Sequence, residues 1–131
     1  MEEEGTYQLI LDIAKETKVT VGALGTFDFS PGTYIYTGRA KRGLQARLHR
    51  HALRRKRRHW HIDYLTTHPG IQLLNAAVIS RHPGAECTEN RKLLKNKSNR
   101  VPVRGFGSSD CRNGCPGHLV QLGALPKTRG G

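Results

Sequence analysis

The chain has 131 residues, which is enough for one domain that buries its own core. Lysine and arginine number 22 against 10 acidic residues, and the resulting charge of +12 favours a polyanionic partner such as DNA, RNA or an anionic membrane surface. The alternative is a basic surface that only keeps the protein in solution, or a scaffold protein without chemistry.

Other features argue against secretion and membrane insertion. No apolar run approaches the roughly 20 residues of a membrane span, and residues 1–4 lack the basic start and apolar core of a secretory signal. An odd number of cysteines, three, disfavours a disulfide framework. We therefore expect a soluble, intracellular protein of the cytoplasm without a membrane partner. Residues 1–131 are expected to form a single domain, with flexible ends at residues 1–4 and 126–131.

The first elements predict an antiparallel sheet. In residues 7–13 apolar side chains occupy every second position, which is typical of a half-buried strand. Glycines interrupt the apolar residues between 19 and 29, and Ser30-Pro31-Gly32 is a strong turn signal before the strand formers at 34–36. The chain between residues 13 and 34 is expected to add a strand or hairpin.

A strand, a glycine turn and a helix are predicted over the next segment. We expect Gly38 to break the strand, and after Gly43 the apolar residues recur at helical spacing. A glycine turn lets the backbone approach a phosphate closely, and guanidinium groups bind phosphate through paired hydrogen bonds. Steps of four, three and four positions would put these cations on one helix face: Arg47, His51, Arg54 and Arg58. The segment therefore predicts a phosphodiester site.

This helix is expected to end in a basic cluster at residues 54–58. One interpretation is a solvated helix end whose cations suit the helix dipole. The other is non-specific binding of a nucleic-acid backbone through counterion release. We favour the second, because the cluster would continue the face of Arg47 and His51. The residues expected to bind nucleic acid are Gly38, Arg39, Lys41, Arg50, Arg54, Arg55, Arg57, Arg58 and His61.

The remaining elements are predicted from periodicity and propensity. Residues 59–65 could alternate as a strand, but we favour a short helix with Trp60 in the core. His59, His61 and Asp63 could bind metal or position a phosphate, or the two histidines are hydrogen-bonded structural groups. Three further elements follow in order: a strand at 71–80, a helix at 86–96 and a closing strand at 119–122.

The glycine-rich tail contains three soft metal ligands at close spacing, Cys111, Cys115 and His118. With Cys87 as a fourth ligand they would form a closed structural zinc site of three thiolates and one imidazole. The alternative is that small buried thiols fill the core beside the last strand, since the spacing is not that of a standard zinc finger. The sequence leaves both interpretations open.

Four ordered segments resemble a known superfamily. Gly5-Thr6-Tyr7 and Tyr36-Thr37-Gly38, the latter followed by a helix with an Arg and a His, are similar to the two signatures of the GIY-YIG endonucleases. Residues 59–65 and Ser109-Asp110-Cys111 before His118-Leu119 extend the resemblance to the small stand-alone Uri-type branch. The resemblance covers nearly the whole chain. It implies an α+β fold, with a small central, mainly antiparallel β-sheet flanked by helices and an added N-terminal strand or hairpin.

The resemblance also implies an activity, the divalent-metal-dependent hydrolysis of phosphodiester bonds in nucleic acid, with DNA as the favoured substrate. Glu86 would hold Mg²⁺ or Mn²⁺, with Glu89 as the alternative, and Arg47 would stabilise charge on the phosphoryl oxygens.

Three further side chains receive roles from the resemblance. Tyr7 would be the general base for water, Tyr36 would orient water or phosphate, and His51 would share the base role or contact phosphate. A free tyrosine has a pKa of about 10, so we expect Arg47 and His51 to favour the phenolate.

Two residues depart from the family pattern. Thr6 replaces the usual isoleucine, and Arg39 stands where the related branch usually has a serine. A different class of function is a non-catalytic DNA- or RNA-binding module of nuclease-like fold, with or without stabilising zinc. A third class is a nucleoprotein scaffold whose fold is held together by zinc. The sequence does not distinguish DNA from RNA, nor does it give the oligomeric state or a protein partner that would supply specificity.

Overall fold

The computed structural model describes residues 3–107 and 114–123. The strands are β1 (Gly5–Ile13), β2 (Thr17–Thr20), β3 (Thr26–Phe29), β4 (Gly32–Ala40), β5 (Ile71–Ser80) and β6 (Leu119–Gln121). The helices are α1 (Leu44–Ala52), α2 (Asp63–Thr66) and α3 (Glu86–Leu94), with short 3₁₀ turns at Gly22–Leu24 and Pro83–Ala85. The predicted α+β class is confirmed.

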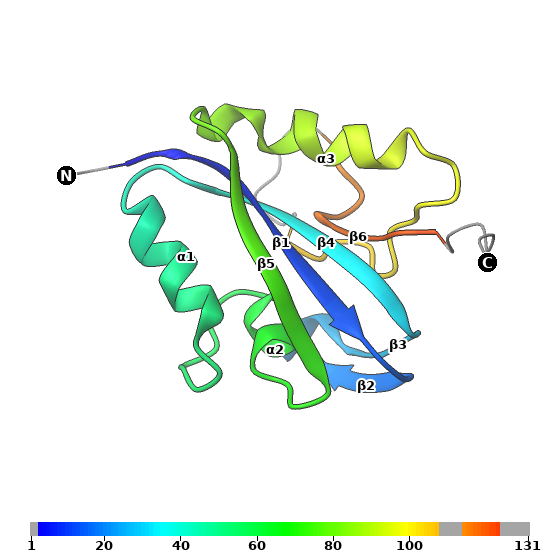
Figure 1. Cartoon of the computed structure of the whole chain (residues 1–131). Helices are drawn as coiled ribbons and strands as arrows, with labels where there is room; N and C mark the ends of the chain where they lie inside the picture. The colour runs from blue at the N-terminus through cyan, green and yellow to red at the C-terminus, as the bar shows by residue number, and fades with distance from the viewer. Residues whose placement is uncertain (1–2, 108–113, 124–131) are drawn as a thin grey trace.

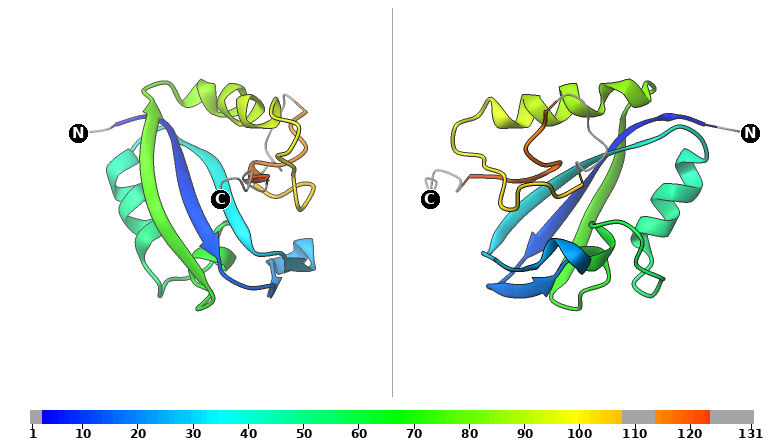
Figure 2. Two further views of the ribbon diagram at one scale, coloured as in Figure 1. Left: turned by 45° about the vertical axis from the view of Figure 1, so that its right-hand side comes forward. Right: turned by 180° about the vertical axis from the view of Figure 1, so that it is seen from behind.

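The main sheet is antiparallel, with the strand order β5-β1-β4-β6, and the expected extra hairpin is present as β2 paired with β3. Figure 1 shows α3 across the top of this sheet and α1 on its left, with α2 and the hairpin below. Strand β6 pairs with β4 and forms one edge of the sheet, and Figure 2 shows α1 and α3 beside the sheet from two further directions. Two helices therefore approach β4 from different sides.

Strand β1 lies in the middle of the core. Its alternating residues Tyr7, Leu9, Leu11 and Ile13 are all buried, with no more than 2% of any side chain exposed. The predicted period of two is confirmed, because one face of β1 packs against the interior while its backbone is paired on both edges.

The prediction that Gly38 breaks the strand is wrong. Gly38 lies inside β4 and pairs with Tyr7 of β1. A Cβ atom at position 38 would come within 2.6 Å of the Tyr7 ring and 3.0 Å of the Tyr36 ring. The glycine therefore makes room for two aromatic rings, and the turn falls later, at Gly43, whose φ of 64° favours glycine.

The prediction that the helix extends into the basic cluster is also wrong. Helix α1 ends at Ala52, and Leu53 is extended, with a φ of −72° and a ψ of 130°. Lys56 turns back and donates to the carbonyls of Arg50 and His51 at 2.9 and 3.0 Å, which satisfies the helix end. Residues 54–58 form a loop, so Arg54 and Arg58 do not share a helix face with Arg47 and His51.

The later elements agree with the sequence patterns. Strand β5 has the predicted bounds, α3 ends two residues early, and β6 ends one residue early. In the part of the chain that the structure describes, none of the helices has the length and apolar character of a membrane span. The predicted flexible residues 1–2 and 126–131 lie outside the described ranges.

Candidate active site

The two tyrosines of the signature segments meet over Gly38. Tyr7 lies on β1 directly opposite Gly38, and Tyr36 lies two residues before it on the neighbouring strand β4. Both rings contact the space that a side chain at position 38 would fill. Both side chains are also nearly inaccessible, at 2% and 8% exposure. The predicted meeting of the two tyrosines is therefore confirmed.

His51 brings α1 into this cluster. Its Nε2 lies 2.8 Å from the Tyr7 hydroxyl, which makes a buried hydrogen bond. The imidazole is 1% exposed, and burial, with a smaller contribution from Lys56, lowers the pKa of His51 to about 4. Among the described residues, His51 Nδ1 has no hydrogen-bond partner. The ring is therefore neutral at neutral pH and supplies no positive charge to Tyr7.

The pKa of Tyr7 differs from the sequence-based expectation. Burial raises it to about 12, although the charge of Arg47 acts in the opposite direction. Burial also raises the pKa of Tyr36 well above the ordinary value. Desolvation of the phenolate is thus the larger effect, and the expectation that nearby cations favour the phenolate is wrong for the free protein.

Arg47 is held from several sides. Its Nη1 donates to the carbonyl of Arg39 at 2.7 Å, and its guanidinium carbon lies 4.6 Å from the centre of the Trp60 ring. A cation at this distance from an aromatic face is attracted to it. Arg47 is therefore a fixed positive charge beside Tyr7, on the first turn of α1.

Glu86 enters from the opposite side, as the first residue of α3. Its Oε2 is 3.0 Å from Nδ1 of His118, and its Oε1 is 3.6 Å from Nε of Arg39. Its negative charge contributes to the raised pKa of both Tyr7 and Tyr36, so it lies within electrostatic reach of them. The side chain is 14% exposed. The alternative ligand, Glu89, instead pairs with Lys92 on the same helix at 3.0 Å.

Several predicted nucleic-acid contacts have structural partners instead. Arg54 donates to the carbonyls of Ile71 and His68 at 2.7 and 3.2 Å. His61 accepts from the backbone N–H of Gly107 at 2.9 Å, and burial lowers its pKa. This geometry favours the structural alternative for His61. Lys41, Arg55, Arg57 and Arg58 are solvent-exposed, and so is Arg54 despite these hydrogen bonds. The guanidinium carbon of Arg58 lies 5.3 Å from the centre of the Tyr64 ring.

A family model matches residues 6–129, and the description of that family is "domain of unknown function DUF123". The chain belongs to this family. DUF123 is related to GIY-YIG-like nucleases, so the resemblance holds at the level of the superfamily. No curated protein and no solved structure matches the chain.

Asp63 has a structural role in this DUF123 chain, and not the metal or phosphate contact considered from the sequence. Its carboxylate is fully buried and accepts both Arg50 nitrogens at 3.0 Å, together with the backbone N–H groups of His59 and Trp60. Burial alone would raise the pKa of Asp63, but these hydrogen bonds outweigh it and hold the pKa below its usual value. The sequence contains one sign of this structural role. Asp63 is the only acidic residue between Asp28 and Glu86, in a segment rich in arginine and lysine that would need a carboxylate partner.

The Asp63 pair changes the role of Arg50. Its guanidinium carbon also lies 4.6 Å from the centre of the Trp60 ring, so Trp60 contacts both Arg47 and Arg50. Arg50 is half-buried, with 28% of its side chain exposed, and its guanidinium donates to Asp63 and to the carbonyl of Arg57. It supports the position of Trp60, and through it that of Arg47, in place of the predicted phosphate contact.

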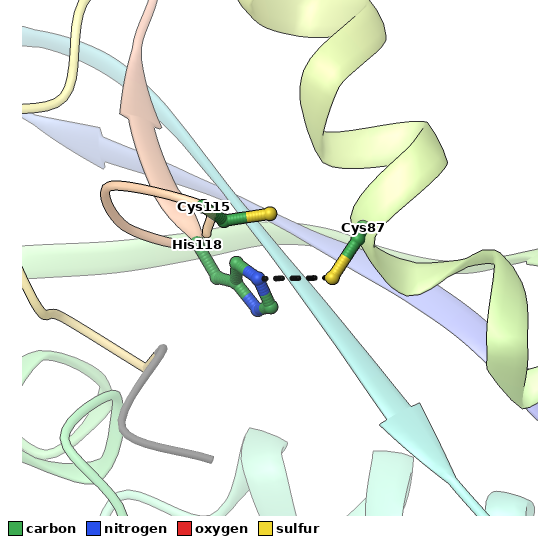
Figure 3. Close-up of side chains that lie close together, drawn as sticks. All are labelled: Cys87, Cys115 and His118. Carbon is green, nitrogen blue, oxygen red and sulfur yellow. Dashed lines mark hydrogen bonds between the residues drawn. The ribbon is translucent and has the colours of Figure 1, made fainter. Parts of the chain in front are cut away.

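The predicted soft ligands are brought together in part. Cys87, Cys115 and His118 are buried, and their potential ligand atoms all lie within 4.8 Å of one another, so the cluster can hold a metal ion. In Figure 3 the Cys87 and Cys115 sulfurs and the His118 ring point toward a common space between α3 and the loop before β6. The fourth predicted ligand, Cys111, lies outside the described residues.

Proposed function

We propose that the protein is a divalent-metal-dependent endonuclease of the Uri-type branch, and that it hydrolyses phosphodiester bonds in nucleic acid, with DNA as the expected substrate. One observation supports this above the others. Five side chains suited to this chemistry come from four separate elements and gather around Gly38: Tyr7, Tyr36, Arg47, His51 and Glu86. A scaffold or simple binding module would not require this combination.

Tyr7 and His51 would act as a hydrogen-bonded pair in activating water. The raised pKa of Tyr7 disfavours a free phenolate in the resting site. A neutral His51 offers a ring nitrogen 2.8 Å away. As Tyr7 takes a proton from the attacking water, it would pass its own proton to His51 Nε2, so that no isolated buried phenolate forms. Tyr36 would position the water or phosphate beside this pair.

Arg47 would stabilise the negative charge that develops on the phosphoryl oxygens. Its contacts with the Arg39 carbonyl and Trp60 fix the guanidinium before substrate arrives. A preorganised charge of this kind needs little rearrangement during the reaction. The exposed cations Lys41, Arg55, Arg57 and Arg58 would bind the backbone on either side, together with Arg39.

The site fits a hard divalent cation such as Mg²⁺ or Mn²⁺. Such an ion commonly uses only one or two protein carboxylates and completes its coordination with water and substrate phosphate. Glu86 is the carboxylate in place, and its Oε1 faces the partly exposed Arg39 at 3.6 Å. When bound, the cation would neutralise the scissile phosphate and stabilise the leaving oxygen. Arg39 would have to turn toward solvent or phosphate to admit it.

One observation favours the alternative of a non-catalytic DNA- or RNA-binding module. Both oxygens of Glu86 have protein partners, His118 and Arg39, as a purely structural carboxylate would. In that case the basic surface would bind nucleic acid, and the interior would serve only stability.

Cleavage of labelled substrates tests both proposals. Single-stranded, double-stranded and branched DNA, with matching RNA, would be incubated with Mg²⁺, Mn²⁺ or EDTA. We expect metal-dependent cleavage that falls about 100- to 1,000-fold in Arg47→Ala, because the variant has no preorganised charge to stabilise the transition state. Arg104→Ala, at an exposed arginine outside the site, is the matched control. Binding without cleavage under every condition would support the binding module and rule out the nuclease.

A further inference from the structure

We propose that Cys87, Cys115 and His118 bind one soft transition-metal ion, with Zn²⁺ as the expected occupant, at a site distinct from that of the hard cation on Glu86. The three potential ligand atoms lie within 4.8 Å of one another, and all three side chains are buried. Two sulfurs and one imidazole nitrogen are donors that select zinc over magnesium or calcium.

The spacing of the donors suits tetrahedral zinc. Zinc–sulfur bonds of about 2.3 Å and zinc–nitrogen bonds of about 2.0 Å place neighbouring donors roughly 3.6 Å apart in a tetrahedron. The distance between Cys87 Sγ and His118 Nε2 is 3.8 Å. A zinc ion could therefore bind these two donors with almost no movement of either side chain.

The orientation of His118 matches that of a metal ligand. Its Nδ1 lies 3.0 Å from the carboxylate of Glu86, which leaves Nε2 directed toward the Cys87 sulfur. Histidines that ligate metals commonly donate their other nitrogen to a carboxylate, which fixes the tautomer and the ring plane. Glu86 supplies this support from the residue next to Cys87, at the start of the same helix.

The three ligands come from two separate parts of the chain, so a bound metal would connect them. Cys87 is on α3, whereas Cys115 and His118 precede β6 in a segment with little regular structure. Asn90, one turn after Cys87, also reaches this segment, through a 2.7 Å hydrogen bond to the carbonyl of Gly117. A bound ion would thus tie α3 to the strand that closes the main sheet.

Metal content of the full-length protein tests the proposal, independently of any nuclease activity. We expect one equivalent of zinc per chain after purification without added metal, measured by mass spectrometry. Metal-free protein refolded with Co²⁺ should show thiolate-to-cobalt charge-transfer absorption and the intense visible bands of a tetrahedral ion. Cys87→Ser and Cys115→Ser should weaken the charge-transfer absorption, and His118→Asn should lower the affinity at least tenfold.

His49→Asn, at an exposed histidine of α1, is the matched control and should keep the full metal content. Two outcomes would overturn the proposal. One is wild-type protein that holds no zinc and gives no cobalt–thiolate absorption. The other is bound metal that is unchanged in the variants of Cys87, Cys115 and His118. Wild-type protein that binds one zinc but cuts no substrate would refute the nuclease alone.

Discussion

Two cationic regions lie close together along the chain and differ in what their charges contact. Around Trp60, the half-buried Arg47 and Arg50 contact the indole ring, backbone carbonyls and the buried carboxylate of Asp63. In the loop at residues 54–58, Arg55 and Arg57 are solvent-exposed. Charges held by several protein partners at the edge of the core have a fixed position, which chemistry requires, whereas exposed charges supply salt-sensitive attraction. The same residue type therefore serves two different purposes here.

The largest effect on stability is expected at the buried pair. Asp63→Ala removes the partner of Arg50, leaves two backbone N–H groups without an acceptor, and removes a charge 3.9 Å from the buried Lys56. Breaking a buried, hydrogen-bonded ion pair from one side costs about 3–5 kcal/mol. Urea unfolding of wild type and variant measures the difference in the free energy of unfolding.

Asp28→Ala is the matched control for this experiment. Asp28 pairs with Lys18 at 2.9 Å, but both side chains are more than half exposed, at 52% and 68%. We expect a loss of less than about 1 kcal/mol. Equal losses in the two variants would show that burial does not distinguish these ion pairs.

The next effect concerns pH and the buried imidazole. His51 has a pKa of about 4 in the folded protein and 6.5 in the unfolded chain, so only the unfolded chain binds this proton between those values. The stability that His51 contributes is complete above pH 6.5 and is lost as the pH falls toward 4. The full loss is on the order of 3 kcal/mol.

Unfolding experiments between pH 4 and 7 would detect this dependence. In His51→Gln the free energy of unfolding should change less steeply with pH than in wild type, because one titrating group is gone. Identical slopes in the two proteins would mean that His51 is not neutral and buried as described.

Substitutions in the exposed loop at residues 54–58 are expected to affect stability least. They should instead weaken the binding of nucleic acid of any sequence. Replacing Arg55, Arg57 and Arg58 together by Gln should change the free energy of unfolding by less than about 1 kcal/mol, mainly through the lost contact of Arg58 with the Tyr64 ring. Affinity for nucleic acid should fall for all sequences alike, and the slope of log affinity against log salt should flatten by about 1 for each phosphate that is no longer neutralised. Arg54 is excluded because it bonds to two backbone carbonyls.

Three other exposed lysines provide the control for net charge. Lys15, Lys95 and Lys97 lie outside the loop, and their replacement by Gln removes the same charge. An equal drop in affinity in this control would show that overall charge, and not the loop, governs binding. Fluorescence anisotropy at several salt concentrations measures both variants.

Periodicity predicted the fold well where one face of an element is buried. The alternation in residues 7–13 corresponds directly to β1. The apolar run at 71–80 also has the bounds of β5, although Ile71 is the one residue of that strand that is buried. The meeting of Tyr7 and Tyr36 also followed from the sequence, because the two residues lie on neighbouring strands of one sheet.

What the sequence did not predict depends on contacts between distant residues. Gly38 was expected to end a strand, because glycine is usually a strand breaker. The reason for a glycine inside β4 is the Tyr7 ring, which occupies the space of a side chain at position 38 and comes from a different strand. The end of α1 depends on Lys56 binding the last carbonyls, and the roles of Arg50 and Arg54 depend on acceptors elsewhere in the chain. The pKa of Tyr7 depends on burial, which counting nearby charges does not reveal.

The position of His118 between Glu86 and Cys87 affects how any metal titration of this protein is interpreted. EDTA removes hard and soft divalent ions alike. With both ions bound as proposed, a stripped protein that receives only Mg²⁺ would have its magnesium ligand attached to an imidazole that has lost its own metal. Magnesium affinity would then be lower in the protein without zinc, and by the same factor zinc affinity would be lower without magnesium, a reciprocal coupling that an enzyme with a single metal site does not show.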